Sequence, residues 1–318
     1  MVTSYILQYQ IETPTAVALG LFDGVHKGHR AVIQKVVEQK SAGLTPCVFT
    51  FTVHGEKPAS KKGYLEIMSD RRKSEIFAQL GIEIELCPDF DQFRDLTPRE
   101  YVEKILVKGL QAKYVACGYD FRFGKGAAGD VGTLRQLCGE YGVEVCVVDH
   151  IDDGGCPVSS TRIRGLILDG EMEEANRLLE SLFTVDTKVI HGRRLGRKLD
   201  FPTINQPFEK GHIIPRFGVY ASIAYVDGTW RPGVTNVGIK PTVEVKDPLA
   251  ETYILDFDGD LYGKSVEVAL LSFLRPERKF DSIEQLKEQI SQDSEAARRI
   301  SGAYLKNRRI EERNLQKI

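Results

Sequence analysis

The chain has 318 residues, of which 42 % are hydrophobic, and its 43 Lys and Arg nearly balance its 45 Asp and Glu, for a formal net charge of -2. That length is enough for two domains with proper cores. The even balance excludes a broad basic surface, so no nucleic-acid partner is expected. No apolar run reaches the roughly 18 residues that a membrane-spanning helix needs, so no membrane association is expected either.

The first residues and the cysteines both predict a cytoplasmic protein. Residues 1–10 do not combine a cationic stretch with an apolar one, so no secretory signal is expected. The six cysteines include no Cys-x-x-Cys pair. This spacing favours free thiols in a reducing compartment over a disulfide framework or a zinc site.

Short apolar runs alternate with helical periods from residue 15 to about residue 182. The expected strands are residues 16–21, 46–51, 82–86, 114–117 and 144–148, and the expected helices are residues 29–42, 70–80, 97–106 and 131–141. Such alternation is typical of a parallel sheet with helices on both faces. Ligands of these sheets bind beyond the carboxyl ends of the strands.

After residue 182 the apolar pattern changes to a period of two. The runs 184–190, 219–226 and 265–272 are separated by Gly, Pro and Asp turns, which predicts a small antiparallel β-barrel. A helical stretch over 282–314 follows. Its arginines could contact RNA, but a solvated helix face is favoured. The change of period places the domain boundary near residue 182.

Residues 19–29 place two histidines three residues apart where a strand gives way to a helix. His26 and His29 share one face of the helix entry. The free N–H groups and the positive end of the helix dipole favour an anion there, and two imidazoles add donors for charge that builds on a phosphoryl group. The segment is therefore predicted to bind the phosphates of a nucleotide.

Two more segments of the first half suit a nucleotide. Residues 118–124 hold two aromatic rings, an acid and an arginine, which could seat a flat ring and a phosphate; phenylalanines that simply fill the core are the alternative. Residues 159–164 place three hydroxyls at a helix start and two arginines in its first turn. Ordinary helix capping is one explanation of the hydroxyls. The other is that the arginines and hydroxyls hold the β- and γ-phosphates of a nucleotide, which leave as pyrophosphate.

The second half offers a different set of polar groups. Residues 192–198 combine two glycines with four basic residues in a predicted phosphate-binding flap, with an exposed turn as the alternative. On an extended segment Thr203 and Asn205 point to the same face and could together hold a metal ion that the nucleotide phosphates chelate. Glu251 opens an apolar strand, where a base could meet a substrate hydroxyl.

Three apparent motifs are interpreted as coincidences. Residues 124–129 spell the dinucleotide fingerprint, but six residues separate them from the preceding strand. Residues 256–267 space their acids as in a calcium loop, but Leu261 stands where that loop needs glycine. Residues 259–265 resemble a Walker A loop one residue too short, and a strand follows them instead of a helix.

Together these segments resemble the prokaryotic bifunctional riboflavin kinase/FAD synthetase family over nearly the whole chain. The nucleotidylyltransferase motifs Gly-x-Phe-Asp-Gly-x-His-x-Gly-His, Gly-x-Asp-Phe-x-Phe-Gly and Ser-Ser-Thr-x-x-Arg are matched at residues 20–29, 118–124 and 159–164. The riboflavin kinase motifs Pro-Thr-x-Asn and Gly-Val-x-Asn-x-Gly-x-x-Pro-Thr are matched at 202–205 and 233–242. The resemblance continues with the Glu-Thr segment at Glu251 and with Phe-Leu-Arg-Pro-Glu at 273–277.

The resemblance implies an enzyme with two activities. Riboflavin and ATP give FMN, and FMN and ATP give FAD and pyrophosphate, with Mg²⁺ accompanying ATP in each reaction. The implied fold is a Rossmann-like FMN adenylyltransferase domain over 1–182, then a riboflavin kinase β-barrel with a long C-terminal helix over 183–318. The expected catalytic residues are His26, His29, Arg164 and Glu251, and the expected metal ligands are Thr203 and Asn205. The expected flavin contacts are Asp120, Phe121 and Phe123, and the expected ATP and phosphate contacts are Gly20, Phe22, Asp23, Gly24, Gly28, Ser159, Ser160, Thr161, Gly192, Arg193, Gly196 and Arg197.

The chain also departs from the family pattern. Val53 and Gly55 replace two prolines of a loop on the nucleotide side, the joint between the domains is altered at 179–183, and Asp200 replaces a glycine. One alternative is therefore a riboflavin kinase whose first domain is impaired. Two others are a flavin-dependent oxidoreductase that uses residues 124–129 and a flavin-sensing regulator that contacts RNA through its last helix.

Overall fold

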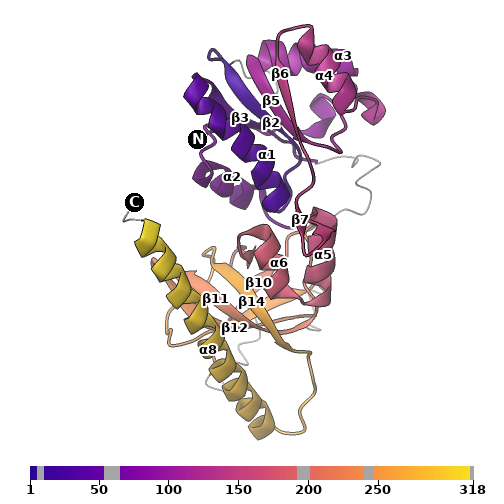
Figure 1. Ribbon diagram of the computed structural model, residues 1–318. Helices are drawn as coiled ribbons and strands as arrows, with labels where there is room; N and C mark the ends of the chain where they lie inside the picture. Colours follow the sequence, from indigo (N-terminus) through magenta and orange to yellow (C-terminus); the bar gives the residue numbers. More distant parts are fainter. Residues whose placement is uncertain (6–10, 54–64, 192–200, 240–246, 316–318) are drawn as a thin grey trace. The chain divides into compact units, whose positions relative to one another are not determined.

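The computed structural model describes residues 1–5, 11–53, 65–191, 201–239 and 247–315. Contacts divide the chain into two compact units, Met1–Ser160 and Thr161–Ile318 (Figure 1). Within the part of the chain that the structure describes, no helix is long and apolar enough to cross a membrane.

The first unit is built on a six-stranded parallel sheet with the order β1-β4-β3-β2-β5-β6. Its strands are β1 (Val2–Ser4), β2 (Thr15–Leu19), β3 (Thr45–Phe49), β4 (Ile84–Leu86), β5 (Ala112–Gly118) and β6 (Glu144–Val148). All five expected strands are present. The edge strand β1, which pairs in parallel with β4, was not expected.

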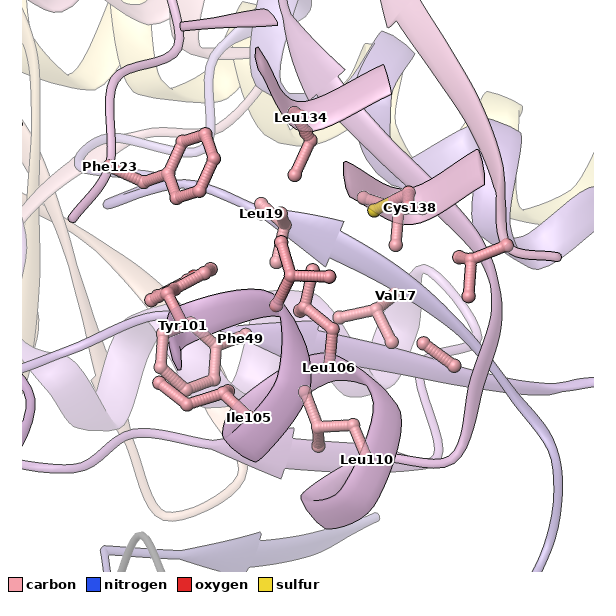
Figure 2. Packing of buried hydrophobic residues seen from close by; sticks show 14 of the residues in the cluster. Val17, Leu19, Phe49, Tyr101, Ile105, Leu106, Leu110, Phe123, Leu134 and Cys138 are labelled. Atoms are coloured by element: carbon pink, nitrogen blue, oxygen red, sulfur yellow. The ribbon is translucent and has the colours of Figure 1, made fainter. Parts of the chain in front are cut away.

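Helices cover both faces of this sheet because residues of β2 alternate between two cores. Ala16 and Ala18 face the core of α1 (Lys27–Val37) and α2 (Asp70–Gln79). Val17 and Leu19 face the core built by η4 (Tyr101–Gly109), which continues the short α3 (Pro98–Glu100), and by α4 (Val131–Gly139). Figure 2 shows this second core around Leu106. The expected Rossmann-like architecture is confirmed.

The second unit contains a six-stranded antiparallel sheet with the order β10-β13-β12-β11-β14-β9. Its strands are β9 (Phe183–Val185), β10 (Thr203–Pro207), β11 (Gly218–Val226), β12 (Thr229–Gly238), β13 (Leu249–Ile254) and β14 (Glu267–Arg275). Beyond β9, Ile190 bridges to Asn205 of β10 at the opposite edge of the sheet. The sheet therefore curls toward closure, as the period-two pattern predicted.

Among the described residues, three α-helices belong to the second unit. The long α8 (Ile283–Leu315) packs on β11, β12 and β14. The helices α5 (Ser160–Asp169) and α6 (Met172–Leu179) lie before β9, and α6 packs against β14 and β9. The Asn176 side chain of α6 donates to the carbonyl of Leu270 at 2.8 Å and accepts from the N–H of Phe183 at 2.7 Å. By contacts the second unit thus begins at Thr161, earlier than the expected boundary near residue 182.

Candidate active sites

The loop between β2 and α1 has a strained backbone that burial holds in place. Phe22 and Val25 have φ of 52° and 38°, which side-chain-bearing residues rarely adopt, and Gly24 has φ of 85°. The Phe22 side chain is 2 % exposed and that of Val25 is 0 % exposed. Gly20 leaves room for the ring of Phe22, since a Cβ there would lie 3.0 Å from its Cζ. These residues set the path of the loop that leads to the histidines.

His26 caps helix α1 and stacks on His29. The Nδ1 atom of His26 accepts a hydrogen bond from the backbone N–H of His29 at 3.4 Å, and the two rings lie 3.6 Å apart at 19°. Gly28 permits this closeness, because a Cβ there would lie 3.3 Å from Cε1 of His26. Next to them, Lys27 Nζ forms an ion pair with Asp153 at 2.8 Å. The two imidazoles therefore meet at the positive end of a helix.

Asp23 joins three segments of the first unit. Its carboxylate accepts from the backbone N–H of Ile67 at 2.9 and 3.2 Å, and its carbonyl accepts from Ser160 Oγ at 3.0 Å. The side chain is 4 % exposed and holds the loop to Ile67, and its predicted contact with the nucleotide phosphates stays a prediction. Ser160 thereby fixes the end of the first unit to the loop of the histidines.

The expected flavin loop divides into core and surface residues. Phe123 is 5 % exposed and packs against Tyr101 and Phe121, at ring distances of 5.2 and 5.7 Å. Phe123 thus packs in the core, as the alternative interpretation of this loop has it, and its predicted contact with the flavin stays a prediction. Phe121 is half-buried and Asp120 is exposed, so both remain candidates.

The unit boundary falls inside the hydroxyl-rich segment 159–164. Ser159 and Ser160 belong to the first unit with the histidines, whereas Thr161 and Arg164 belong to the second. Arg162 contacts Glu174 of α6 at 3.3 Å. The predicted pyrophosphate role of Thr161 and Arg164 stays a prediction.

A row of three polar side chains crosses neighbouring strands of the second unit. Glu251 on β13 lies directly opposite Asn205 on β10 and opposite Asn236 on β12. Residues opposite each other in an antiparallel pair share a face, with Cβ atoms about 4.5–5.5 Å apart. Thr203 lies on the same face, two residues from Asn205. The structure thus brings the expected base and both expected metal ligands together.

A cavity of about 790 Å³ shares Thr203 with this group of residues, whereas Asn205, Glu251 and Asn236 are not among its lining residues. Thr203, Thr252, Ile254 and the turn 257–262 line it, so it combines hydroxyl groups with the rings of Phe257 and Tyr262 and the carboxylates of Asp258 and Asp260. The ring of Tyr262 lies 4.0 Å from that of His191. Such a partly apolar pocket with a few polar groups can hold a flat ring joined to a charged chain.

Buried hydroxyls support the strands below the row. Thr235 donates to Ser222 Oγ at 2.8 Å and shares a hydrogen bond of 2.9 Å with Thr252, and all three are 0 % exposed. Ser301 of α8 donates to the carbonyl of Ser222 at 2.9 Å. These bonds tie β11, β12, β13 and α8 together next to Glu251.

The cysteines offer no activated nucleophile in the first unit's core. Burial raises the pKa of Cys87, Cys117 and Cys138 to about 12, so their thiols stay protonated at neutral pH. Cys47, fully buried, also has a raised pKa. All six cysteines are free thiols, as expected.

Two features of the second site were not predicted from the sequence. Asn236 was predicted only as one residue of the motif at 233–242, and its position opposite Glu251 follows only from the strand register. The turn 257–262 was noticed for two motifs it does not form, yet it lines the cavity. The expected phosphate contacts Gly192, Arg193, Gly196 and Arg197 lie outside the described residues, as do the altered positions Gly55 and Asp200.

Comparisons with known proteins cover both units. A model of FAD synthetase matches residues 8–162, and a model of riboflavin kinase matches residues 179–301. The bifunctional riboflavin kinase/FMN adenylyltransferase of Escherichia coli K12 is 36 % identical over 288 residues, which are 89 % of this chain and 92 % of that protein. Its namesake from Bacillus subtilis is 34 % identical over 298 residues, which are 90 % of this chain and 92 % of that protein.

A solved structure agrees with the fold of the whole chain. The crystal structure of a protein from Streptococcus pneumoniae, described as a macrolide-efflux protein, has a TM-score of 0.83 at 29 % identity. It covers 93 % of this chain and 98 % of that one. The two family models match in sequence order, and the relatives are similar to this chain over almost their full length. This chain therefore belongs to the bifunctional riboflavin kinase/FMN adenylyltransferase family.

Proposed function

We propose that His26 and His29 serve adenylyl transfer and that Glu251 serves riboflavin phosphorylation in this enzyme. Both activities belong to the chain: it converts riboflavin and ATP to FMN, and FMN and ATP to FAD and pyrophosphate. The matches to both family models disfavour the three alternatives, namely a kinase with an impaired first domain, an oxidoreductase and a regulator.

The row of Asn205, Glu251 and Asn236 is the observation that carries the kinase assignment. In the proposed step, Glu251 takes the proton of the terminal ribityl hydroxyl as its oxygen attacks the γ-phosphorus of ATP. The bond from that phosphorus to the β-phosphate oxygen breaks, and ADP leaves. The nearby cavity would receive the nucleoside part of ATP.

Thr203 and Asn205 are the proposed protein ligands of Mg²⁺ in the kinase site. Oxygen ligands suit this ion, and it usually keeps few protein ligands alongside substrate phosphates. Among the described residues, no group of three or more His, Cys, Asp and Glu could hold a metal. When bound with ATP, the ion would neutralise charge on the phosphates, while Thr203 and Asn205 would fix its place relative to Glu251.

In the adenylyl site, His26 and His29 would stabilise charge on the α-phosphate while an oxygen of the FMN phosphate attacks it. Their stacked position at the start of α1 supports this role. Ser159, Ser160, Thr161 and Arg164 would hold the departing pyrophosphate. Asp120, Phe121 and Phe123 would contact the flavin, with Phe123 reaching it from the edge of the core. We further propose that the enzyme acts in the cytoplasm, to which its free thiols are suited.

Substitution of Glu251 tests the kinase assignment. Glu251→Gln keeps the size of the side chain but removes the proton acceptor, so turnover should fall by roughly 10² to 10⁴ with little change in riboflavin affinity. Thr203→Val should instead raise the Mg²⁺ concentration needed for half-maximal rate. Formation of FAD from supplied FMN is the internal control and should not change. Full riboflavin phosphorylation by Glu251→Gln would remove Glu251 from the mechanism.

A further inference from the structure

The Phe-Leu-Arg-Pro-Glu segment at the end of β14 has no role in the sites described so far. Its Arg275 makes a bidentate ion pair with Asp293 of α8: Nε lies 3.1 Å from each carboxylate oxygen, and a terminal nitrogen lies 2.8 Å from Oδ2. Asp293 is 5 % exposed. Arg275 also donates to the carbonyl of Pro276 at 3.1 Å. The backbone just before Glu277 is therefore held to the long helix.

Glu277 reaches from this anchored segment to strand β12. Its Oε1 accepts a hydrogen bond from Nδ2 of Asn236 at 3.0 Å. Gly238 makes room for the contact, because a Cβ at that position would overlap the Glu277 carboxylate. The sequence motifs at 233–242 and 273–277, which are far apart in the chain, thus meet through one hydrogen bond to a charged acceptor, a strong type of hydrogen bond.

Asn236 is also the neighbour of Glu251 in the row across the sheet. Its carboxamide therefore has the Glu277 carboxylate on one side and lies opposite the proposed base on the next strand. The hydrogen bond to Glu277 fixes which way the carboxamide turns. A fixed carboxamide limits the positions open to the Glu251 carboxylate and to a hydroxyl bound beside it.

We propose that Glu277 is a positioning residue for riboflavin phosphorylation, and that it acts through Asn236 on the geometry of Glu251. The inference rests on the proposed role of Glu251 as base. Loss of Glu277 releases the Asn236 carboxamide while leaving Glu251, Thr203 and Asn205 in place. Because small displacements of a reacting group lower rates steeply, the loss should reduce kcat rather than substrate affinity.

The test uses the full chain and measures FMN formation from riboflavin and ATP. Glu277→Ala should lower kcat about tenfold or more, with the KM values for riboflavin and ATP within about twofold of the parent, as expected for a group that acts only on the reacting geometry. Glu277→Gln keeps an oxygen that can accept from Asn236 and should recover most of this loss. Glu288→Ala, which removes an exposed glutamate of α8, is the matched control.

A double-mutant cycle identifies the partner. Asn236→Ala should lower kcat to a similar degree, and adding Glu277→Ala to it should cause little further loss, since both residues act through one contact. Additive losses, or a parental kcat in Glu277→Ala, would overturn the inference. So would an equal loss of FAD formation from FMN, because that result would indicate general misfolding.

Glu251→Gln, assayed in parallel, separates this inference from the function it rests on. If Glu251→Gln is inactive and Glu277→Ala has the parental kcat, only the role of Glu277 fails. If Glu251→Gln has the parental kcat, the base assignment fails and the inference falls with it.

Discussion

We expect the second unit to fold on its own only when helix α6 is present. A fragment that begins at Thr161 retains this helix. A fragment that begins at Phe183, where the change of apolar period places the domain boundary, lacks it. In α6 the side chains of Met172, Leu178 and Leu179 are 0 % exposed. Burial of a Leu or Met side chain contributes about 1.5–3 kcal/mol, so these three contribute at least about 4 kcal/mol.

The Asn176 side chain adds two hydrogen bonds, to Leu270 and Phe183, worth about 0.5–1.5 kcal/mol each. A domain is typically stable by only about 5–15 kcal/mol. The fragment 183–318 should therefore be largely unfolded at 25 °C, while the fragment 161–318 should unfold cooperatively and phosphorylate riboflavin.

Urea denaturation followed by circular dichroism, together with a riboflavin phosphorylation assay, compares the two fragments. Asn176→Ala in the longer fragment provides an intermediate case, with an expected loss of about 1–3 kcal/mol, because it leaves the Leu270 carbonyl and the Phe183 N–H without this partner. If the fragment 183–318 matched the longer one in stability and turnover, the contribution assigned to α6 would be refuted.

Three further predictions concern both units. His26→Ala or His29→Ala should reduce the rate of FAD formation from FMN by a factor of about 10² or more, as expected when one preorganised hydrogen-bond donor to the transition state is lost. FMN formation should not change, and chromatography of the products measures both reactions. FAD formation at the parental rate would exclude these histidines from the adenylyl site. Burial raises the pKa of Glu85, so the stability this group contributes is present below its unfolded pKa and is lost as pH rises through its folded pKa. Glu85→Gln, which can still accept from Ser74 and Thr3, should therefore be more stable than the parent at pH 7 and lose that advantage in acid, as urea titrations at both pH values would reveal. Arg275→Met should destabilise the second unit by about 3 kcal/mol or more because it leaves Asp293 buried without its cation, and Asp293→Leu added to it should restore much of the loss.

The alternation of strands and helices was enough to predict the parallel sheet, because strands buried on both faces leave long apolar runs such as that of β2. It could not predict β1, whose three residues are too few to display a period. Nor could it assign α6 to the second unit. The helix has an ordinary apolar face, and only its packing on β14 and β9 shows which sheet that face covers.

The sites were predicted to different degrees for a similar reason. His26 and His29 are neighbours along one helix, so their spacing alone predicted that they would meet. Thr203 and Asn205 were paired by the two-residue period of a strand. Asn236 joins the site through strand register, and Glu277 joins it from the segment that follows β14. Neither relation is visible as a spacing in a single sequence. Phe123 belongs to the core because Tyr101 and Gly129 leave a space that its ring fills.

The positive φ angles of Phe22 and Val25 have a consequence for nucleotide affinity. A β-branched residue such as Val25 keeps this backbone conformation only while its side chain remains buried, so the energy of the unfavourable conformation is supplied when the first unit folds. A nucleotide bound at the adenylyl site proposed above would meet a loop whose shape is already fixed, so binding would carry little entropic cost of ordering the loop. Substitutions of the core residues packed against Val25 should consequently weaken ATP binding at this proposed site, although those residues do not contact the ligand.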